Sequence, residues 1–202
     1  IIRARVLSKL LREKEAVNFI ANFDLISGGS NELLSKLLSG RLDFSLIGSV
    51  APLVHPNLTV QALDQREFYI FTSQDNPLSQ KSEISFEEAL DYPFILLEES
   101  FVHAKAFQNL KDKYQKDAKV LLHFSDVQTI GQLVKSNIGI TLMTDFLPFR
   151  DMENLVKIPL AAKDKEIFYV QYAYLKTAVL NEDLQQLVAM LDKLAKVEDT
   201  LR

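Results

Sequence analysis

The chain has 202 residues, of which 48% are hydrophobic and 25% are charged, values that are ordinary for a soluble globular protein. It has no apolar run of the roughly 18 residues that a membrane-spanning helix needs and no visible signal peptide, so we expect no membrane contact and a cytoplasmic location. Cysteine is absent, which excludes disulfides and thiolate chemistry, and the net charge of −4 argues against DNA binding by this chain itself. Because residue 1 is Ile rather than Met, we expect a piece of a longer protein.

The N-terminal part is predicted as helix, strand, helix and strand. Apolar residues at helical spacing indicate a helix over 3–16, and alternation indicates a strand over 21–27. Leucines at positions 33, 34, 37 and 38 predict a helix over 31–39, which Gly40 ends because glycine enters the left-handed conformation at little cost. The apolar run that follows is typical of a buried strand over 43–48.

The rest of the chain continues this alternation. Pro52 and Pro56 predict a loop, and an aromatic and β-branched run predicts a strand over 67–73. Ser85 and Glu88 have the spacing of a capping box at the start of a short helix. Further elements are expected as strand 94–97, helix 101–116, strand 119–124, helix 129–136, strands 140–143, 155–160 and 166–175, and a last helix capped by Asn181. Alternating strands and helices place the chain in the α/β class.

Three predicted helices begin at a serine, namely Ser30, Ser100 and Ser125. The start of a helix offers free backbone N–H groups and the positive end of the helix dipole, and the serine adds a hydroxyl. Such a site suits an anion such as a carboxylate. The alternative is that each serine only caps its helix, which is the commonest use of serine there.

No catalytic or metal-binding pattern is found. His55, His103 and His123 do not have the spacing of metal ligands, and there is no nucleophile elbow, phosphate-binding loop or dinucleotide-binding motif. Glu87 and Glu88 lie in the first turn of a helix, where acidic side chains favour the dipole. We therefore expect no catalytic residues, no metal and no cofactor, and a protein that is not an enzyme.

Five segments, in this order, resemble the effector-binding domain of LysR-type transcriptional regulators: Ser27–Ile47, Asn76–Leu78, Ile84–Ile95, Val127–Leu142 and Leu155–Leu160. The resemblance implies an α/β fold with two lobes, like that of periplasmic binding proteins, joined at a hinge by two crossover strands near Thr72–Gln74 and Gln171–Ala173. Lobe I is then expected to hold residues 1–72 and 172–202, and lobe II residues 73–171. The N-terminal winged helix-turn-helix domain of the family is absent from this chain.

The resemblance also implies a function. We expect a small-molecule effector to bind between the lobes and to modulate transcription. The helix starts suit a carboxylate, and Glu98 and Glu99 suit an amino-acid-like metabolite if one of them faces the cleft rather than the solvent. Gln128 would bind a polar group of the effector and Phe101 would cover its apolar part, unless Phe101 belongs to the core. The implied contacts are Gly29, Ser30, Asn31, Gly48, Ser49, Ser100, Phe101, Val127, Gln128 and Thr144.

Members of this family pair side by side and antiparallel, which implies a homodimer here and a tetramer in the full-length protein. DNA would be contacted only through the missing N-terminal domain. Two other functions stay open from the residues alone: a stand-alone solute-binding protein of a transport system, and an enzyme on the same fold. The implied interface places Val6, Leu7 and Leu10 of one copy against Ile130, Leu133 and Val134 of the other.

Overall fold

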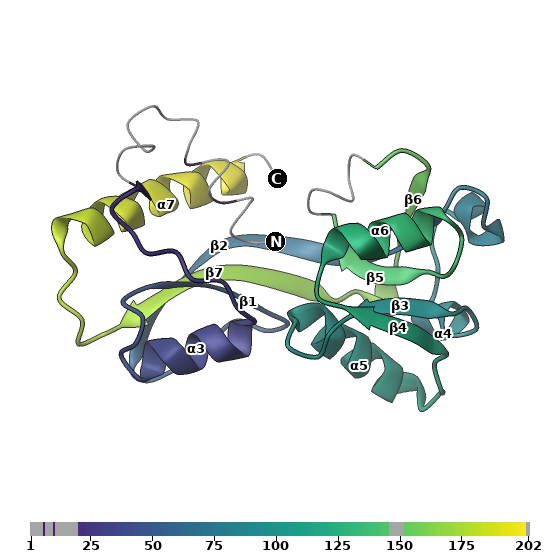
Figure 1. Cartoon of the computed structure of the whole chain (residues 1–202), viewed down its shortest axis with the longest axis horizontal. Helices are drawn as coiled ribbons and strands as arrows, with labels where there is room; N and C mark the ends of the chain where they lie inside the picture. The colour runs from purple at the N-terminus through teal and green to yellow at the C-terminus, as the bar shows by residue number, and fades with distance from the viewer. Residues whose placement is uncertain (1–5, 7–9, 11–19, 146–151, 201–202) are drawn as a thin grey trace. The chain divides into compact units, whose positions relative to one another are not determined.

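The structure is a computed structural model, and it describes residues 6, 10, 20–145 and 152–200, with side chains up to residue 195. The chain divides into two compact units, unit 1 with residues 1–65 and 169–202 and unit 2 with residues 66–168. It passes from unit 1 to unit 2 within strand β2 (Leu58–Ser73) and returns within strand β7 (Ile167–Leu175), as Figure 1 shows. The resemblance had placed these passages at 72/73 and 171/172, somewhat later in each strand.

Unit 1 is built from β1 (Ser45–Ser49), helices α3 (Ser30–Leu38) and α7 (Glu182–Thr200), and parts of β2 and β7. Strand β1 pairs with β7 in antiparallel fashion, and β7 in turn is hydrogen-bonded to β2. Figure 1 draws α3 and α7 on opposite sides of these strands. The apolar side of α3 packs against the strands in a core that contains Leu37, Ile47, Leu58 and Ala173.

Local sequence signals set the limits of the two helices in unit 1. Gly40, which follows α3, has a φ of +71°, as predicted for the residue that ends this helix. Asn181 caps α7, because its Oδ1 accepts a hydrogen bond of 2.9 Å from the amide of Leu184. Farther along α7, Asp192 accepts a 2.7 Å hydrogen bond from the hydroxyl of Tyr172, which ties the helix to β7.

Two predictions for unit 1 are wrong. The segment 21–27 forms no strand, and its Leu25 and Ile26 are 51% and 49% exposed. None of the described strands pairs with it, and alternation alone cannot provide a hydrogen-bond ladder. The loop predicted after Pro52 is also too long. Strand β2 begins at Leu58, immediately after Pro56 and Asn57, since proline interrupts only the residues near it. The first predicted helix, 3–16, lies almost entirely outside the described residues.

Unit 2 contains a parallel pair of strands covered by helices, and three antiparallel strands. In the first group β3 pairs with β4, and Figure 1 shows α5 and α6 on opposite faces of the pair. In the second group β2 pairs with both β5 and β6. The elements are η1 (Pro77–Gln80), α4 (Phe86–Ala89), β3 (Phe94–Leu97), α5 (Val102–Tyr114), β4 (Val120–Phe124), α6 (Val127–Lys135), β5 (Thr141–Thr144), β6 (Leu155–Pro159) and η3 (Ala162–Asp164).

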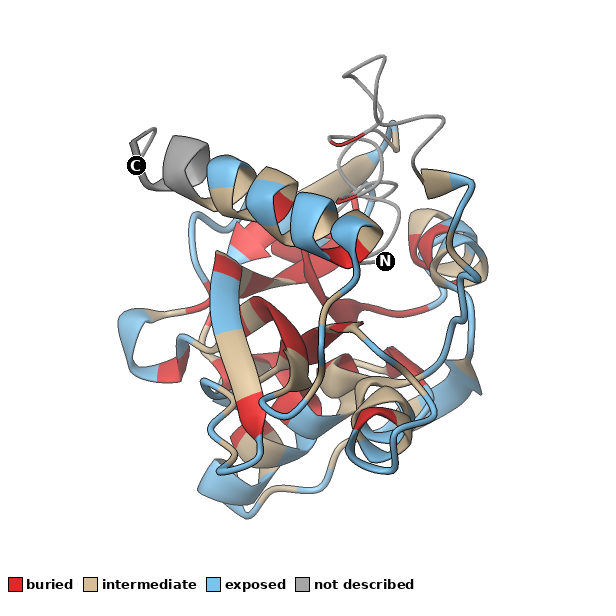
Figure 2. Ribbon diagram, turned by 90° about the vertical axis from the view of Figure 1, so that its left-hand side faces the viewer, coloured by how far each residue is buried: buried red, intermediate tan, exposed pale blue. Residues whose placement is uncertain are grey.

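The core of unit 2 is aromatic at one end. The rings of Phe86, Phe94 and Phe107 lie 4.9 to 6.0 Å apart between centroids, in tilted and edge-on arrangements that aromatic rings prefer. Figure 2 shows that buried residues lie on the strands and on the inner sides of the helices throughout the described chain, and that exposed residues lie on the outer sides. None of the described helices combines the length and the apolar character that crossing a membrane would require.

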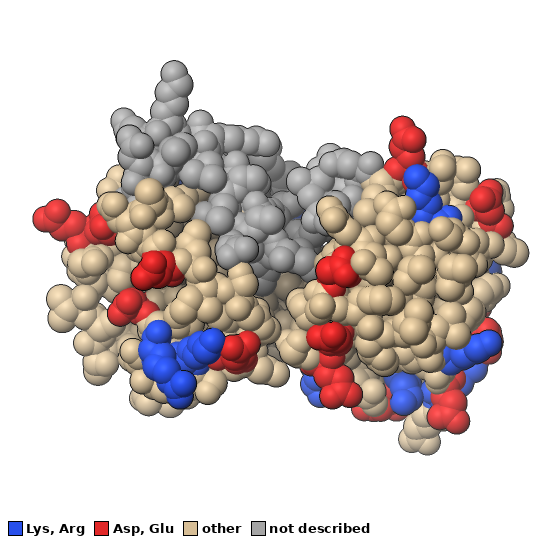
Figure 3. All heavy atoms as spheres, in the orientation of Figure 1, with Lys and Arg blue, Asp and Glu red and all other residues tan. Residues whose placement is uncertain are grey.

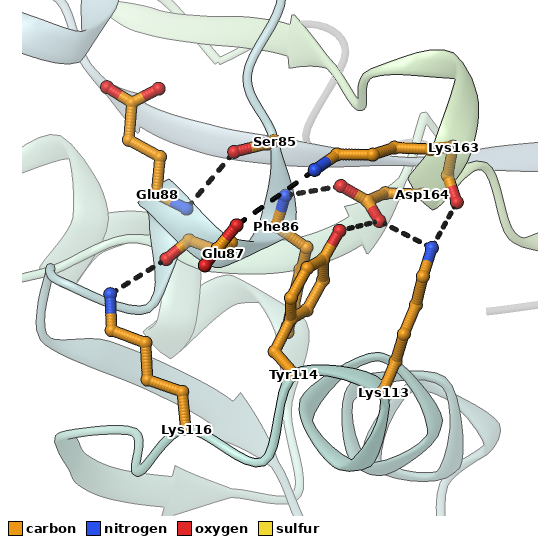
Figure 4. Close-up of polar contacts among 9 residues, drawn as sticks. All are labelled: Ser85, Phe86, Glu87, Glu88, Lys113, Tyr114, Lys116, Lys163 and Asp164. Carbon is orange, nitrogen blue, oxygen red and sulfur yellow. Dashed lines mark hydrogen bonds and ion pairs between the residues drawn. The ribbon is translucent and has the colours of Figure 1, made fainter.

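A buried carboxylate connects three elements of unit 2, as Figure 4 shows. Asp164, at the end of η3, accepts hydrogen bonds from the amide of Phe86 (2.8 Å), from Nζ of Lys113 (2.9 Å) and from the hydroxyl of Tyr114. Burial by itself would raise the pKa of Asp164, but these hydrogen bonds lower the pKa below its usual value. Beside it, Ser85 caps α4 by accepting from the amide of Glu88, as predicted.

Candidate functional site

In unit 1, the start of α3 lies against the end of β1. Gly29 is the N-cap residue of α3, so the alternative that Ser30 only caps this helix is excluded. Ser30 is instead the first helical residue, and its Oγ accepts a 3.1 Å hydrogen bond from the amide of Gly48 in β1. This bond brings Gly29, Ser30 and Asn31 to the same edge as Gly48 and Ser49.

The loop that follows β1 is held by a buried amide from β7. Gln171 is 3% exposed, and its Oε1 accepts a 2.9 Å hydrogen bond from the amide of Leu53 while its Nε2 donates at 2.8 Å to Oγ of Ser49. Ser49 in turn donates to the carbonyl of Ala51 at 2.5 Å. The sequence analysis missed Gln171. Its signal is a polar residue inside the aromatic strand 166–175, where an unpaired amide would be costly.

In unit 2, two parallel strands end beside two helix starts. The amide of Glu98, after β3, donates to the carbonyl of Phe124 at the end of β4, so both strands end at one edge. This edge therefore carries Ser100 and Phe101 before α5, and Val127 and Gln128 in the first turn of α6. Of these four residues Ser100 and Gln128 are exposed, and Phe101 and Val127 are half-buried.

In unit 2 neither Ser100 nor Ser125 caps its helix, so the capping alternative is excluded there as well. The N-cap residue of α5 is Phe101, which makes no side-chain cap, while Ser100 precedes it. The N-cap residue of α6 is Asp126, whose Oδ1 accepts a 2.7 Å hydrogen bond from the amide of Thr129. That hydrogen bond lowers the pKa of Asp126. A carboxylate of the protein itself thus occupies the start of α6, where the sequence had suggested room for a bound anion.

Thr144, the predicted contact at the end of β5, is buried beside a histidine. Its Oγ1 lies 3.4 Å from Nε2 of His103, in the first turn of α5. The His103 ring also packs edge-on against Phe68 of β2, with centroids 5.4 Å apart, and against Phe168 of β7 at 5.3 Å. Burial lowers the pKa of His103 to about 3, so this ring is neutral near pH 7.

The residues predicted for a dimer interface fall into three groups. Ile130 and Val134 are completely buried in the core of unit 2, so these two side chains do not reach its surface, because they form the inner side of α6. Leu133 is half-buried. Val6 and Leu10 are helical and buried, and Leu7 lies outside the described residues.

The described residues carry no cluster of three or more His, Cys, Asp or Glu side chains that is placed to hold a metal ion. On the face drawn in Figure 3, basic and acidic side chains are interspersed over the described part of the chain. Many are paired, for example Lys36 with Glu32 at 2.7 Å and Lys81 with Glu88 at 2.8 Å. The groups held together at the end of β1 are therefore neutral hydroxyls, amides and backbone N–H groups, whereas the edge of unit 2 also carries the exposed carboxylates of Glu98, Glu99 and Asp126.

Comparison with known proteins gives the family. The LysR substrate binding domain model matches residues 2–196. The malolactic fermentation system transcriptional activator of Lactococcus lactis is 41% identical over 187 residues, which are 93% of this chain and 64% of the relative. A second relative, the HTH-type transcriptional regulator YybE of Bacillus subtilis, is 27% identical over 68% of this chain and 46% of its own length. The chain thus spans about half to two thirds of the length of these relatives.

Solved structures agree on the fold. The regulatory domain of CcmR from Synechocystis PCC6803, in complex with 2-PG, has a TM-score of 0.77 at 19% identity, covering 96% of this chain and 93% of that one. The effector binding domain of QuiR in complex with shikimate has a TM-score of 0.71 at 16% identity, covering 94% and 88%.

These matches confirm the predicted α/β fold with two units and favour a regulatory domain over a stand-alone solute-binding protein. The family match extends over almost the whole chain, and the more similar relative exceeds 40% identity over nearly the same residues. The chain belongs to the family of LysR substrate binding domains.

Proposed function

We propose that this chain is the effector-sensing domain of a transcriptional activator of malolactic fermentation, and that its effector is a small hydroxy acid or dicarboxylic acid of the L-malate type. The observation that carries the proposal is the 41% identity over 93% of the chain to an activator of such a system. The name of this process refers to malic and lactic acid, so we take these two acids as the first candidate effectors.

The chemistry of the candidate site is compatible with such an effector. In unit 1, the start of α3 offers backbone N–H groups and the hydroxyl of Ser30 beside the amide-rich end of β1. In unit 2, the exposed amide of Gln128 can both donate to and accept from a carboxylic acid. In unit 1 no counter-charge is needed, since oriented N–H groups stabilise a carboxylate.

The effector would act by favouring one arrangement of the two units over another. A ligand shifts such an equilibrium only by the difference between its affinities for the two states. The chain passes between the units within β2 and β7, which makes these strands the natural hinge. In the full-length protein, we infer that the change reaches DNA through an N-terminal winged helix-turn-helix domain, in a cytoplasmic homodimer or tetramer.

The proposal is tested with a thermal-shift titration of the purified chain against L-malate, L-lactate, succinate and L-aspartate at millimolar concentration. A ligand that binds only the folded state raises the melting temperature by mass action. We expect L-malate to raise it, and we expect Ser30→Ala and Gln128→Ala to reduce the rise. The matched control is Ser39→Ala, at the opposite end of α3, where the hydroxyl only donates to the carbonyl of Lys36. A rise with none of the acids would contradict the proposed effector class.

A further inference from the structure

A short relay of hydrogen bonds in unit 1 has only one possible direction. The amide of Leu53 can only donate, so the side-chain atom of Gln171 that faces it at 2.9 Å is the carbonyl oxygen Oε1. The other end of the same amide, Nε2, must then face Ser49 and donate to its Oγ at 2.8 Å. With that bond made, Ser49 turns its own proton to the carbonyl of Ala51, 2.5 Å away.

The direction of the relay decides what Ser49 can still offer. A serine hydroxyl has one proton and two acceptor lone pairs. In Ser49 the proton is donated to Ala51, and one lone pair receives Nε2 of Gln171. What is left is a single lone pair on a side chain that is half-buried and therefore partly accessible. Toward a bound molecule, Ser49 is an acceptor.

Ser30, at the same edge, can act as a hydrogen-bond donor toward a bound molecule. Its Oγ accepts from the amide of Gly48, the residue before Ser49, at 3.1 Å. Among the described residues the structure assigns no acceptor to the Ser30 proton, so this hydroxyl can donate. The Ser30 hydroxyl is held by Gly48 and the Ser49 hydroxyl belongs to the next residue of β1, so a donor and an acceptor lie at the same end of this strand. Together they suit a molecule that carries an acceptor group and a donor group close to each other.

We propose that Gln171 is a positioning residue that holds Ser49 as a hydrogen-bond acceptor and thereby selects effectors with a donor group, such as a 2-hydroxyl or a 2-ammonium, next to a carboxylate. The carboxylate is received by the Ser30 hydroxyl and the first N–H groups of α3, and the neighbouring donor by Ser49. This inference rests on the proposed function. It adds the chemical group by which the chain distinguishes its effector from a similar acid that lacks a donor. Gln171 itself is 3% exposed and acts through Ser49 rather than by touching the effector.

The experiment uses L-malate and succinate, two acids that differ by one hydroxyl. Affinities are measured by isothermal titration calorimetry with the whole 202-residue chain. The wild-type chain is expected to bind L-malate about tenfold more tightly than succinate, the upper range for one net hydrogen bond. Ser49→Ala removes the acceptor, so the ratio is expected to fall close to one through a loss of L-malate affinity alone.

Two substitutions of Gln171 separate positioning from a merely structural role. Gln171→Leu frees the Ser49 hydroxyl to rotate, and the ratio is expected to fall to about threefold or less, since part of one hydrogen bond is lost. Gln171→Glu still accepts from Leu53 and now accepts the Ser49 proton, which leaves Ser49 an acceptor toward the effector, so the ratio is expected to persist. A purely structural role would weaken both acids equally in both variants.

The outcomes distinguish the two proposals. An unchanged ratio in a folded Gln171→Leu chain, or in Ser49→Ala if the former does not fold, overturns the role of Gln171 while the proposed function stands. Equal affinity of the wild-type chain for L-malate and succinate also overturns the role of Gln171 and leaves the proposed function standing. Binding of neither acid contradicts the proposed effector class and this inference together. Ser39→Ala, distant from the relay on the same helix as Ser30, is the control and is expected to keep both affinities.

Discussion

Nε2 of His103 lies 3.4 Å from Oγ1 of Thr144, and both side chains are almost completely buried, at 4% and 2% exposure. The contact joins the first turn of α5 to the end of β5. Because the His103 ring also packs against Phe68 and Phe168, it reaches the two strands in which the chain changes unit. Through neutral, buried groups, His103 thus connects a predicted effector contact with the two strands in which the chain passes between the units.

The neutral state of His103 predicts a specific pH dependence. Its pKa falls from 6.5 to about 3 in the folded chain because of burial, so between these values the unfolded chain binds a proton that the folded chain does not. The contribution of neutral His103 to the free energy of unfolding is therefore fully present above pH 6.5. It is lost as the pH falls below this value, by about 1.4 kcal/mol per pH unit. Urea unfolding of the wild type and of His103→Gln at pH 7, 6 and 5 measures the difference.

The control for this prediction is His123→Gln, because His123 lies on β4 and is exposed. It is expected to keep the wild-type pH dependence, whereas His103→Gln lowers the overall stability but flattens its change with pH. If His103→Gln and the wild type lost stability in parallel between pH 7 and 5, His103 would not be the group responsible.

Removal of the Asp164 charge is expected to destabilise unit 2. In Asp164→Asn one carboxylate oxygen becomes an NH₂ group that faces either the Phe86 amide or the Lys113 ammonium, both of which are donors. Asp164 is buried whereas Lys113 is 43% exposed, so the expected cost is about 1–3 kcal/mol, that of leaving a buried hydrogen-bonding group unsatisfied. The free energy of unfolding in urea measures this loss. Glu87→Gln, an exposed acid of α4 beside the same network, is the control and is expected to change stability by less than about 0.5 kcal/mol.

The same carboxylate predicts an acid limit. The pKa of Asp164 is lowered in the folded chain, so its contribution to stability is present above the unfolded pKa of about 3.9 and is lost as the pH falls through the folded value. A stability difference between the wild type and Asp164→Asn that stayed constant down to pH 2 would contradict this assignment.

Gly139 is expected to tolerate no side chain. A Cβ at this position would lie 2.7 Å from the carbonyl oxygen of Pro93, a backbone atom that also accepts from the amide of Ile140. Gly139→Ala is therefore expected to cost about 1–3 kcal/mol, the range for overpacking. Thermal unfolding of Gly139→Ala against Gly28→Ala checks the reason. In the latter the close contacts of the new Cβ are with the movable end of Glu32, and Leu33 lies at an ordinary contact distance of 3.6 Å, so a comparable loss in both variants would reject the steric argument.

The predicted dimer interface now depends on fewer residues. With Ile130 and Val134 inside the core, Leu133 is the remaining predicted residue of α6 that a second copy could reach. Leu133→Asp is expected to shift a dimer toward monomer by at least tenfold in dissociation constant, because a buried charge without a partner is costly. Sedimentation equilibrium measures the shift, and Val179→Asp, at a position 97% exposed, is the control. An unchanged dimer in Leu133→Asp would exclude α6 from the interface.

Where sequence reasoning succeeded, the signal was local. The leucine spacing of α3, the Ser85 cap of α4 and the Asn181 cap of α7 each depend on residues within a few positions, and each is found as predicted. Where it failed, the deciding hydrogen-bond partner was distant in the sequence, or a neighbouring residue made the cap instead. Ser30 caps no helix, and its hydroxyl instead accepts a hydrogen bond from the amide of Gly48. Asp126 rather than Ser125 caps α6, because a charged carboxylate oxygen is the stronger acceptor.

The amino-acid sequence by itself determined the alternation of strands and helices, the family resemblance and the stretches that carry the candidate site, because periodicity, caps and turn residues act within a few positions along the chain. Only the tertiary structure decided which groups of that site donate hydrogen bonds and which accept them. Gln171 and Ser49 are 122 positions apart, and so are joined only when β7 lies beside β1. His103 and Thr144 are 41 positions apart and meet only when α5 packs near the end of β5. Which hydroxyl donates and which accepts depends on partners that folding alone brings within hydrogen-bond distance.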